Sequence, residues 1–193
     1  MRIIAGEWRG RKLAAPKGDG TRPTADRARE TLFAMLTSRL GDFEGLQIAD
    51  LFAGSGALGL EALSRGAAHC LFVEQDRAAV DVIRTNITAL GAEARSRVEV
   101  GSVMQLRAAA APLDLILADP PYQSGAGEVA LDRLRRLGWI GPETWIALET
   151  SFKEDVAIKG LAMEAERRVG KGKLSLLRLA TPDADPGPSE RGV

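Results

Sequence analysis

Short apolar runs alternate with amphipathic segments through the middle of the chain. Helical spacing of the apolar positions predicts three helices there, over 57–66, 77–90 and 129–137. The apolar runs between them have the length of buried strands. They lie at 46–52, 69–76, 97–100, 113–119 and 144–150. Strands that alternate with helices in this way indicate a mostly parallel sheet with helices on both faces.

The two ends of the chain have other patterns. Near the C-terminus, the alternation over 162–169 and 173–180 predicts an antiparallel hairpin that completes the sheet. Near the N-terminus, a small hairpin is expected before an amphipathic helix over 25–40, with Thr24 as the N-cap of that helix. We therefore divide the chain into three parts. They are an N-terminal extension (1–40), a main domain (41–180) and a tail (181–193) whose composition predicts disorder.

The composition is that of a soluble globular protein, with 193 residues, of which 45% are hydrophobic and 27% charged. The single Cys70 excludes an intramolecular disulfide. Together with a single histidine, His69, it also excludes multi-cysteine and histidine-rich metal sites, so no metal is expected. No apolar stretch approaches transmembrane length, and the N-terminus lacks the apolar core of a signal peptide. We expect a cytoplasmic protein that does not contact a membrane.

Charge is unevenly distributed along the chain although the net charge is zero. Residues 1–40 hold nine Lys or Arg against four Asp or Glu, whereas residues 41–158 hold ten against seventeen. Residues 159–178 are basic again, with six against two. This asymmetry is compatible with an anionic partner that contacts the ends of the chain, but from charge alone basic faces that are simply solvated are slightly favoured.

A glycine-rich loop, GSGALG (54–59), follows the first predicted strand of the main domain and opens a helix. In this context G-x-G-x-x-G indicates a nucleoside-containing cofactor. The first glycine permits the turn, the second exposes backbone to the ligand, and the third lets helix and sheet pack closely. Glu74 follows Gly54 by twenty residues, where a carboxylate can accept both ribose hydroxyls. A dinucleotide and S-adenosylmethionine both remain possible, but Asp50 and the acidic middle segment suit the cationic sulfonium better.

The sequence DPPY (119–122) stands at the end of the fourth predicted strand of the main domain. Consecutive prolines fix the backbone and offer no N–H donor. Asp119 and the carbonyl of Pro120 therefore present two acceptors to an amino group, and Tyr122 offers a flat face for a base. These features predict methylation of an exocyclic amine on a nucleobase, with catalysis by positioning and by the negative charge of Asp119.

Together, the glycine loop, VEQD (73–76) and DPPY resemble the class I S-adenosylmethionine-dependent methyltransferases that modify an exocyclic or amide nitrogen. Residues 2–13 and 21–33, RIIAGEWRGRKL and TRPTADRARETLF, are also similar to the N-terminal region of the bacterial 16S rRNA (guanine-N2) methyltransferases. This resemblance implies an α/β fold of the Rossmann-like class I type. Its mostly parallel seven-stranded sheet would have helices on both faces and a C-terminal antiparallel hairpin, beside a small basic N-terminal extension.

The resemblance also implies a set of site residues. The amine site would consist of Asp119, Pro120 and Tyr122. The S-adenosyl-L-methionine site would consist of Asp50, Phe52, Gly54, Ser55, Gly56, Glu74, Gln75, Ser102, Val103 and Asp119. Ser102 is included because the segment after the third strand lacks the acidic residue that often binds the adenine amine in related enzymes.

The substrate would be 16S rRNA, in assembled or assembling small ribosomal subunits, bound by a monomer. The candidate RNA contacts are Arg9, Arg11, Arg22, Thr24, Arg27 and Arg29. Trp8 either packs in the core or stacks on a base. Two other enzymes fit parts of the pattern. A DNA or RNA amino-methyltransferase acting on adenine N6 or cytosine N4 shares the DPPY chemistry, and an NAD-dependent oxidoreductase shares the glycine loop.

Overall fold

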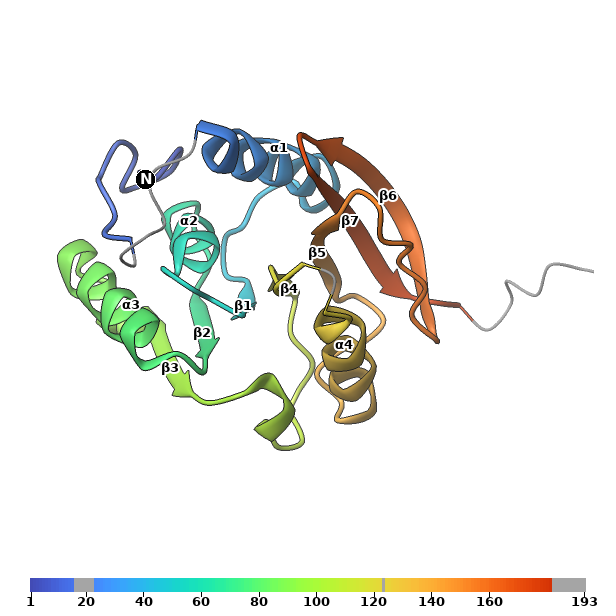
Figure 1. Cartoon of the computed structure of the whole chain (residues 1–193). Coiled ribbons are helices and arrows are strands. Elements are labelled where there is room, and N and C mark those ends of the chain that lie inside the picture. The colour runs from blue at the N-terminus through green and yellow to red at the C-terminus, as the bar shows by residue number, and fades with distance from the viewer. Residues whose placement is uncertain (16–22, 123, 182–193) are drawn as a thin grey trace, which may run out of the picture.

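The computed structural model describes residues 1–15, 23–122 and 124–181. Seven strands form one sheet in the order β3-β2-β1-β4-β5-β7-β6 (Figure 1). The strands are β1 (Gln47–Leu51), β2 (His69–Glu74), β3 (Ser96–Val100), β4 (Leu115–Ala118), β5 (Trp145–Ser151), β6 (Leu161–Val169) and β7 (Gly172–Leu179). Strands β1 to β5 pair parallel with one another, and β7 pairs antiparallel with both β5 and β6. The predicted parallel sheet and the C-terminal hairpin are both confirmed.

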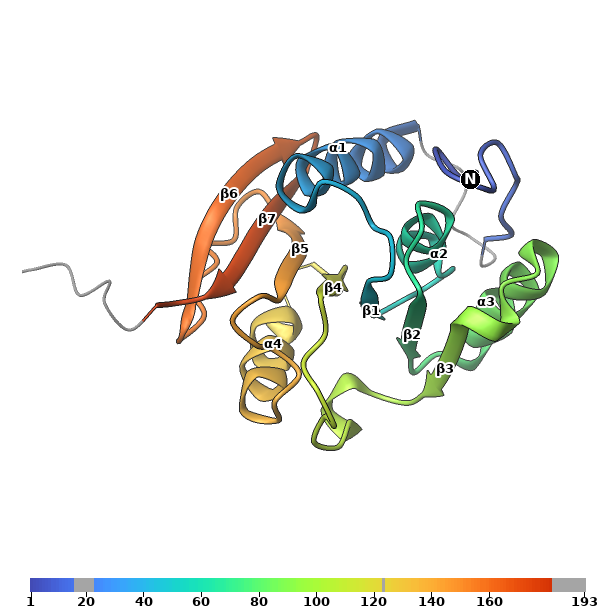
Figure 2. The same ribbon diagram turned by 180° about the vertical axis from the view of Figure 1, so that it is seen from behind.

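Helices cover both faces of the sheet, as Figures 1 and 2 show from opposite sides. The helices are α1 (Pro23–Leu40), α2 (Ala57–Ser64), α3 (Arg77–Leu90) and α4 (Ala126–Arg136), with two short 3-10 turns, η1 (Glu93–Arg95) and η2 (Val103–Gln105). Alternate residues of the central strands pack into two separate cores. In β4, Leu115 and Leu117 pack with α1, α2 and α3, whereas Ile116 and Ala118 pack with α4. Within the described residues, no helix is long and apolar enough to cross a membrane.

The predicted starts of two helices are wrong. Helix α1 begins at Pro23, so Thr24 lies in its first turn and is not the N-cap. Proline is favoured at the first helical position because its fixed φ suits a helix and its missing N–H would have had no helical partner. Helix α4 begins at Ala126, three residues before the predicted start, after Gly125 in a left-handed conformation. Arg22 and the tail beyond residue 181 lie outside the described residues.

The N-terminal segment, residues 1–15, is bound to the main domain through side chains of α2 and α3. The Glu61 carboxylate of α2 is fully buried and accepts the backbone N–H groups of Ile4, at 2.8 Å, and Ala5, at 3.0 Å. In α3, the amide of Asn86 accepts the Ala14 N–H at 2.8 Å and donates to the Ala14 carbonyl at 3.1 Å. The predicted small hairpin is present in these residues as an antiparallel bridge between Arg2 and Lys12.

Two cations complete the surroundings of Glu61. Arg65 donates to the Glu61 carboxylate at 2.9 Å, and the Nε of Arg29 lies 3.9 Å from it. Arg29 is only 5% exposed, donates to the Arg2 carbonyl and pairs with Asp26 at 3.0 Å. The prediction that Arg29 contacts RNA is therefore wrong, because its guanidinium holds the N-terminal segment against α1 and α2. Trp8 packs in the core, with the Arg95 guanidinium 4.7 Å from the centre of its ring.

Replacement of Glu61 should therefore destabilise the protein strongly. Glu61→Ala removes one partner of a buried ionic cluster and leaves two backbone N–H groups without an acceptor. We expect a loss of about 3–5 kcal/mol in the free energy of unfolding, measured by urea denaturation. Glu7→Ala is the matched control, because Glu7 is exposed and pairs with Arg95 at 2.8 Å. It should cost about 1 kcal/mol or less. Equal losses for the two variants would contradict the assigned role of Glu61.

Candidate active site

The carboxyl ends of β1, β2 and β4 meet at one edge of the sheet. Leu51 of β1 is in register with Val73 of β2 and with Ala118 of β4. The glycine loop follows β1, Glu74 is the last residue of β2, and DPPY follows β4. Three segments that are distant in sequence therefore lie together. Ligands of open α/β sheets bind at such an edge.

The glycine loop makes its turn through left-handed backbone conformations. Gly54 has φ 55° and Gly56 has φ 77°, and Phe52 has φ 58° although it carries a side chain. A residue other than glycine is strained at positive φ, and such residues occur preferentially at functional sites.

Gly59 lets α2 pack closely against the sheet, as predicted for the third glycine. A Cβ atom at Gly59 would lie 2.4 Å from Phe72 Cε1 and 2.6 Å from Cys70 Sγ. Gly56 has a constraint on its core side as well, and its predicted contact with a ligand stays a prediction. A Cβ atom there would point into the core, 3.3 Å from Phe72 Cε1 and 3.5 Å from Ile83. Gly56 is therefore required by its left-handed conformation and by core packing.

Asp50 is buried below the loop and fixes the start of α2. Its carboxylate accepts the Gly59 N–H at 2.8 Å. Burial raises the pKa of the Asp50 carboxyl well above its ordinary value. The Gly59 N–H opposes this rise in the pKa, and the nearby carboxylates of Asp119 and Glu74 add to it. Three acidic groups are thus close enough to influence one another, which makes this edge of the sheet favourable for a cation.

Glu74 ends β2 and connects it to the glycine loop. One carboxylate oxygen accepts the Gly54 N–H at 2.8 Å, and the other accepts the N–H groups of Gln75 and Asp76, both at 2.8 Å. A carboxylate has about four acceptor positions, so three of them are already occupied. Glu74 therefore holds the loop in its observed conformation in addition to its predicted role toward ribose.

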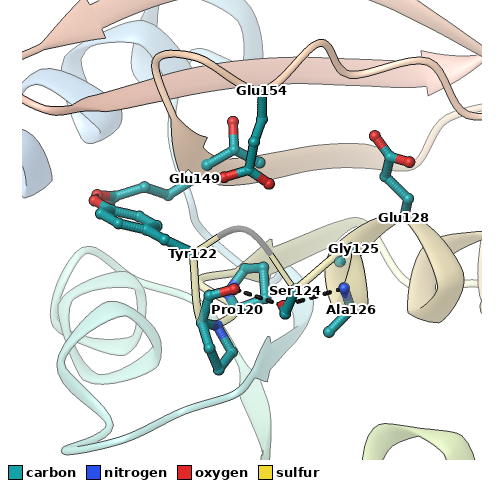
Figure 3. A pocket seen from close by; sticks show the side chains of 11 residues that line it. Pro120, Tyr122, Ser124, Gly125, Ala126, Glu128, Glu149 and Glu154 are labelled. Atoms are coloured by element: carbon teal, nitrogen blue, oxygen red, sulfur yellow. Dashed lines mark hydrogen bonds between the residues drawn. The ribbon is translucent and has the colours of Figure 1, made fainter.

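The DPPY step lies beside a small pocket, which Figure 3 shows. Asp119 is exposed and follows β4 directly, with its N–H 3.4 Å from the Leu51 carbonyl. Pro120 is buried, and Tyr122 is 48% exposed. The Tyr122 hydroxyl donates to Glu149 Oε1 at 2.7 Å (Figure 3). Ser124 donates to the Pro121 carbonyl at 2.6 Å and accepts the Ala126 N–H at 3.2 Å, so the step leads directly into α4.

Sequence reasoning missed Glu149 and the other acidic residues of this pocket, Glu128 and Glu154. Glu149 lies near the carboxyl end of β5, which is the strand beside β4. The same strand-end rule that identified Glu74 and Asp119 applies to Glu149, once the order of the strands is known.

Comparisons with known proteins agree with this geometry. The family described as "Conserved hypothetical protein 95" matches residues 1–178. Ribosomal RNA small subunit methyltransferase D of Escherichia coli K12 is 42% identical over 153 residues, which are 79% of this chain and 76% of that protein. The chain therefore belongs to the family of ribosomal RNA small subunit methyltransferase D. The enzyme of the same name from Haemophilus influenzae is 38% identical over 155 residues, 78% of each chain.

Solved structures show the same fold. A candidate methyltransferase from Escherichia coli superimposes with a TM-score of 0.79 at 37% identity, covering 93% of this chain and 97% of that one. Magnesium protoporphyrin IX methyltransferase from Synechocystis, solved with bound S-adenosylmethionine, has a TM-score of 0.63 at 14% identity over 83% of this chain and 86% of that one. The predicted resemblance and the class I methyltransferase fold are confirmed, and the family implies a cofactor of the S-adenosylmethionine type.

The segment expected to hold adenine in this methyltransferase fold follows β3. Ser102 caps η2 and accepts the Met104 N–H at 3.3 Å, while its own N–H donates to Gln105 at 3.2 Å. Val103 is buried against the core that contains α4. The Gly101 N–H donates to the Glu74 carbonyl at 2.9 Å, so this turn is connected to the end of β2.

The candidate RNA contacts that the structure describes differ in their surroundings. Arg9, Arg11 and Arg27 are exposed. Arg11 donates to the Ala89 carbonyl near the end of α3, which holds its side chain across the surface. Arg9 and Arg11 lie on the N-terminal segment that Glu61 and Asn86 bind, so these two cations are presented by a fixed backbone.

Proposed function

We propose that this protein transfers a methyl group from S-adenosyl-L-methionine to the exocyclic N2 of a guanine in the 16S rRNA of the small ribosomal subunit. One observation carries the proposal. The DPPY step, Glu74 and the glycine loop occupy one edge of the sheet, in a chain related to enzymes named ribosomal RNA small subunit methyltransferase D. A 16S rRNA substrate places the reaction in the cytoplasm. One copy of the chain carries every residue proposed for the site, so a monomer suffices.

The residues present fit the proposed cofactor. The carboxylates of Asp50, Glu74 and Asp119 form an acidic edge, which suits the cationic sulfonium, and Glu74 retains one acceptor position for a ribose hydroxyl. Phe52, Ser55, Gln75, Ser102 and Val103 belong to the loops around this edge and are proposed to complete the site. When bound, S-adenosylmethionine supplies a methyl group on a sulfur that becomes a neutral leaving group.

In the proposed mechanism Asp119 and the Pro120 carbonyl each accept a hydrogen bond from one N–H of the guanine amine. These two hydrogen bonds turn the nitrogen lone pair out of the ring plane and aim it at the methyl carbon. The N–C bond forms as the C–S bond breaks, and positive charge develops on the nitrogen. Asp119 offsets that charge and then receives the proton, which passes to water because Asp119 is exposed. Tyr122 stacks on the extruded base.

The N-terminal extension supplies the proposed contacts to RNA phosphates. Arg9, Arg11 and Arg27 are the exposed candidates among the described residues, and Arg22 and the side chain of Thr24 remain predictions. These contacts would contribute affinity that weakens as salt rises. Phosphate contacts do not distinguish bases, so the pocket beside DPPY would select the target base.

A product analysis tests the proposed function. The protein is incubated with methyl-labelled S-adenosylmethionine and with small subunits that lack this modification, and the rRNA is digested to nucleosides. The label should appear in N2-methylguanosine. Label in N6-methyladenosine or N4-methylcytidine, or absence of label, would rule out the proposed reaction.

Replacement of Glu74 should weaken cofactor binding. Glu74→Ala removes the acceptor proposed for ribose and also leaves the Gly54 N–H without its partner. We expect a loss of about 1.5–3 kcal/mol in binding free energy, measured by titration calorimetry with S-adenosylmethionine. Glu93→Ala, an exposed change in η1, is the control and should bind normally. Unchanged affinity for Glu74→Ala, or tight binding of NAD, would argue against the assigned cofactor site.

Replacement of Asp119 should slow methyl transfer without weakening cofactor binding. Asp119→Asn keeps the size of the side chain but removes its charge, and it can present an NH₂ where an acceptor is needed. We expect the single-turnover rate to fall by about 10²-fold or more, because the lost interaction is strongest in the transition state.

Asp114→Asn is the matched control for Asp119→Asn. Asp114 precedes the same strand at its opposite end and accepts the Gln47 N–H at 2.7 Å, which an asparagine oxygen can also do. Its rate should stay near that of the wild type. A wild-type rate for Asp119→Asn would contradict the amine-site mechanism.

A further inference from the structure

The Tyr122–Glu149 pair lies next to the proposed amine site. Leu148 of β5 is in register with Ala118 of β4, so the residues that follow them, Glu149 within β5 and Asp119 just after β4, lie next to each other. Figure 3 shows the tips of the Tyr122 and Glu149 side chains meeting at one side of the pocket. Their hydrogen bond, 2.7 Å from the hydroxyl to Oε1, fixes the orientation of the carboxylate.

The surroundings of this pair shift the pKa of both groups. Burial raises the pKa of the Tyr122 phenol far above its ordinary value, and its hydrogen bond to Glu149 adds to the rise. Burial also raises the pKa of Glu149, while the hydrogen bond from Tyr122 opposes that rise. In their hydrogen bond the Tyr122 hydroxyl is the donor and Glu149 Oε1 is the acceptor. Tyr122 occupies only one of the two carboxylate oxygens of Glu149, and in the described part of the chain it is the one group that hydrogen-bonds to this carboxylate.

The backbone of β7 lies against the pair. A Cβ atom at Gly172 would lie 2.9 Å from Glu149 Oε1 and 3.0 Å from the Tyr122 hydroxyl. The pair thus occupies the space beside a glycine and has little freedom to move in that direction. Glu128 and Glu154 also line the pocket, and no described lining residue is a lysine or an arginine. The pocket therefore offers acceptors to a ligand that brings N–H donors.

Guanine is the base that brings such donors side by side. Its Watson–Crick edge presents N1–H next to the N2 amino group. Adenine and cytosine place an unprotonated ring nitrogen beside their amino group, and a carboxylate would repel that nitrogen. A site built around a hydrogen bond also discriminates strongly against a ligand that lacks the matching group, because the buried polar atom is then left without a partner.

We propose that Glu149 is the residue that selects guanine. Its carboxylate, oriented by Tyr122, accepts the N1–H of the target base while Asp119 and Pro120 take the adjacent N2 amino group. This inference rests on the proposed function and adds to it the means of base selection. It also gives the Tyr122 hydroxyl a role separate from that of the ring, which stacks on the base.

A base analogue tests the inference directly. Small subunits are reconstituted with 16S rRNA that carries either guanine or 2-aminopurine at the position where the label was found. 2-Aminopurine keeps the amino group that is methylated, but its N1 is an acceptor. The wild-type protein should prefer guanine by about 10²-fold or more in kcat/KM, since the analogue leaves Glu149 facing a lone pair.

Glu149→Gln should change this preference. The glutamine amide can donate to the N1 of 2-aminopurine and can no longer offer two equivalent acceptors to guanine. We expect the ratio of kcat/KM for the two bases to fall at least about tenfold, through a lower value for guanine and a higher one for the analogue. Affinity for S-adenosylmethionine should not change, which also shows that the variant is folded.

Two further variants keep the inference testable. Tyr122→Phe keeps the ring and removes the hydroxyl that orients Glu149, so it should reduce the guanine preference by less than Glu149→Gln does. Glu143→Gln is the control, because Glu143 stands before β5 at the end opposite Glu149 and pairs with Arg178 on the surface, at 3.1 Å. It should keep the wild-type ratio.

The outcomes separate this inference from the proposed function. If the wild-type protein forms N2-methylguanosine but Glu149→Gln and Tyr122→Phe keep its preference for guanine, the role of Glu149 is refuted and the proposed function stands. If the wild-type protein labels another nucleoside, the proposed function itself fails.

Discussion

The parallel pairing of β1 with β2 and β4 is the constraint on which the rest of the site depends. Parallel strands in register end at the same edge, so Asp50, Glu74 and Asp119 come together although the chain separates them widely. Burial raises the pKa of the Asp50 carboxyl, and repulsion from the carboxylates of Asp119 and Glu74 adds to that rise. Groups that repel one another are stable together only if backbone N–H groups compensate, and Gly54, Gly59, Gln75 and Asp76 provide them.

The N-terminal extension is joined to this same edge. Asn86 bonds to Ala14 on one side and donates to the Ser55 carbonyl of the glycine loop at 2.9 Å on the other. One α3 side chain therefore contacts both the segment that carries Arg9 and Arg11 and the loop assigned to the cofactor. Glu61 binds the same segment to α2. In the proposed reaction this arrangement holds the RNA-contacting cations at a fixed position relative to the methyl donor.

Local patterns were sufficient to predict the strands, most of the helices and the close packing at Gly59, because each depends on neighbouring residues in the chain. Burial of charged side chains could not be predicted in this way. Arg29 lies in a basic stretch of sequence that predicts an exposed cation, but its position is set by Glu61 on another helix. The core constraint on Gly56 could not be predicted either, because it comes from Phe72 and Ile83, which belong to later elements.

Glu149 shows the same limit within the site. Its strand was predicted, but the importance of its position depends on β5 lying next to β4, and strand order is a tertiary property. The order also explains why Tyr122 can reach Glu149 although twenty-seven residues separate them. The DPPY step could be recognised from the sequence because proline restricts the backbone locally. The groups that face it could not, because they come from β5 and α4.

A crystal structure with bound S-adenosylhomocysteine tests the central claim most directly, namely that this edge of the sheet holds the cofactor in front of the amine site. The ribose hydroxyls should lie within hydrogen-bonding distance of Glu74, and the sulfur should face Asp119 and the Pro120 carbonyl across the space for a methyl group. A ligand bound away from Glu74, or one whose sulfur points away from Asp119, would contradict the account.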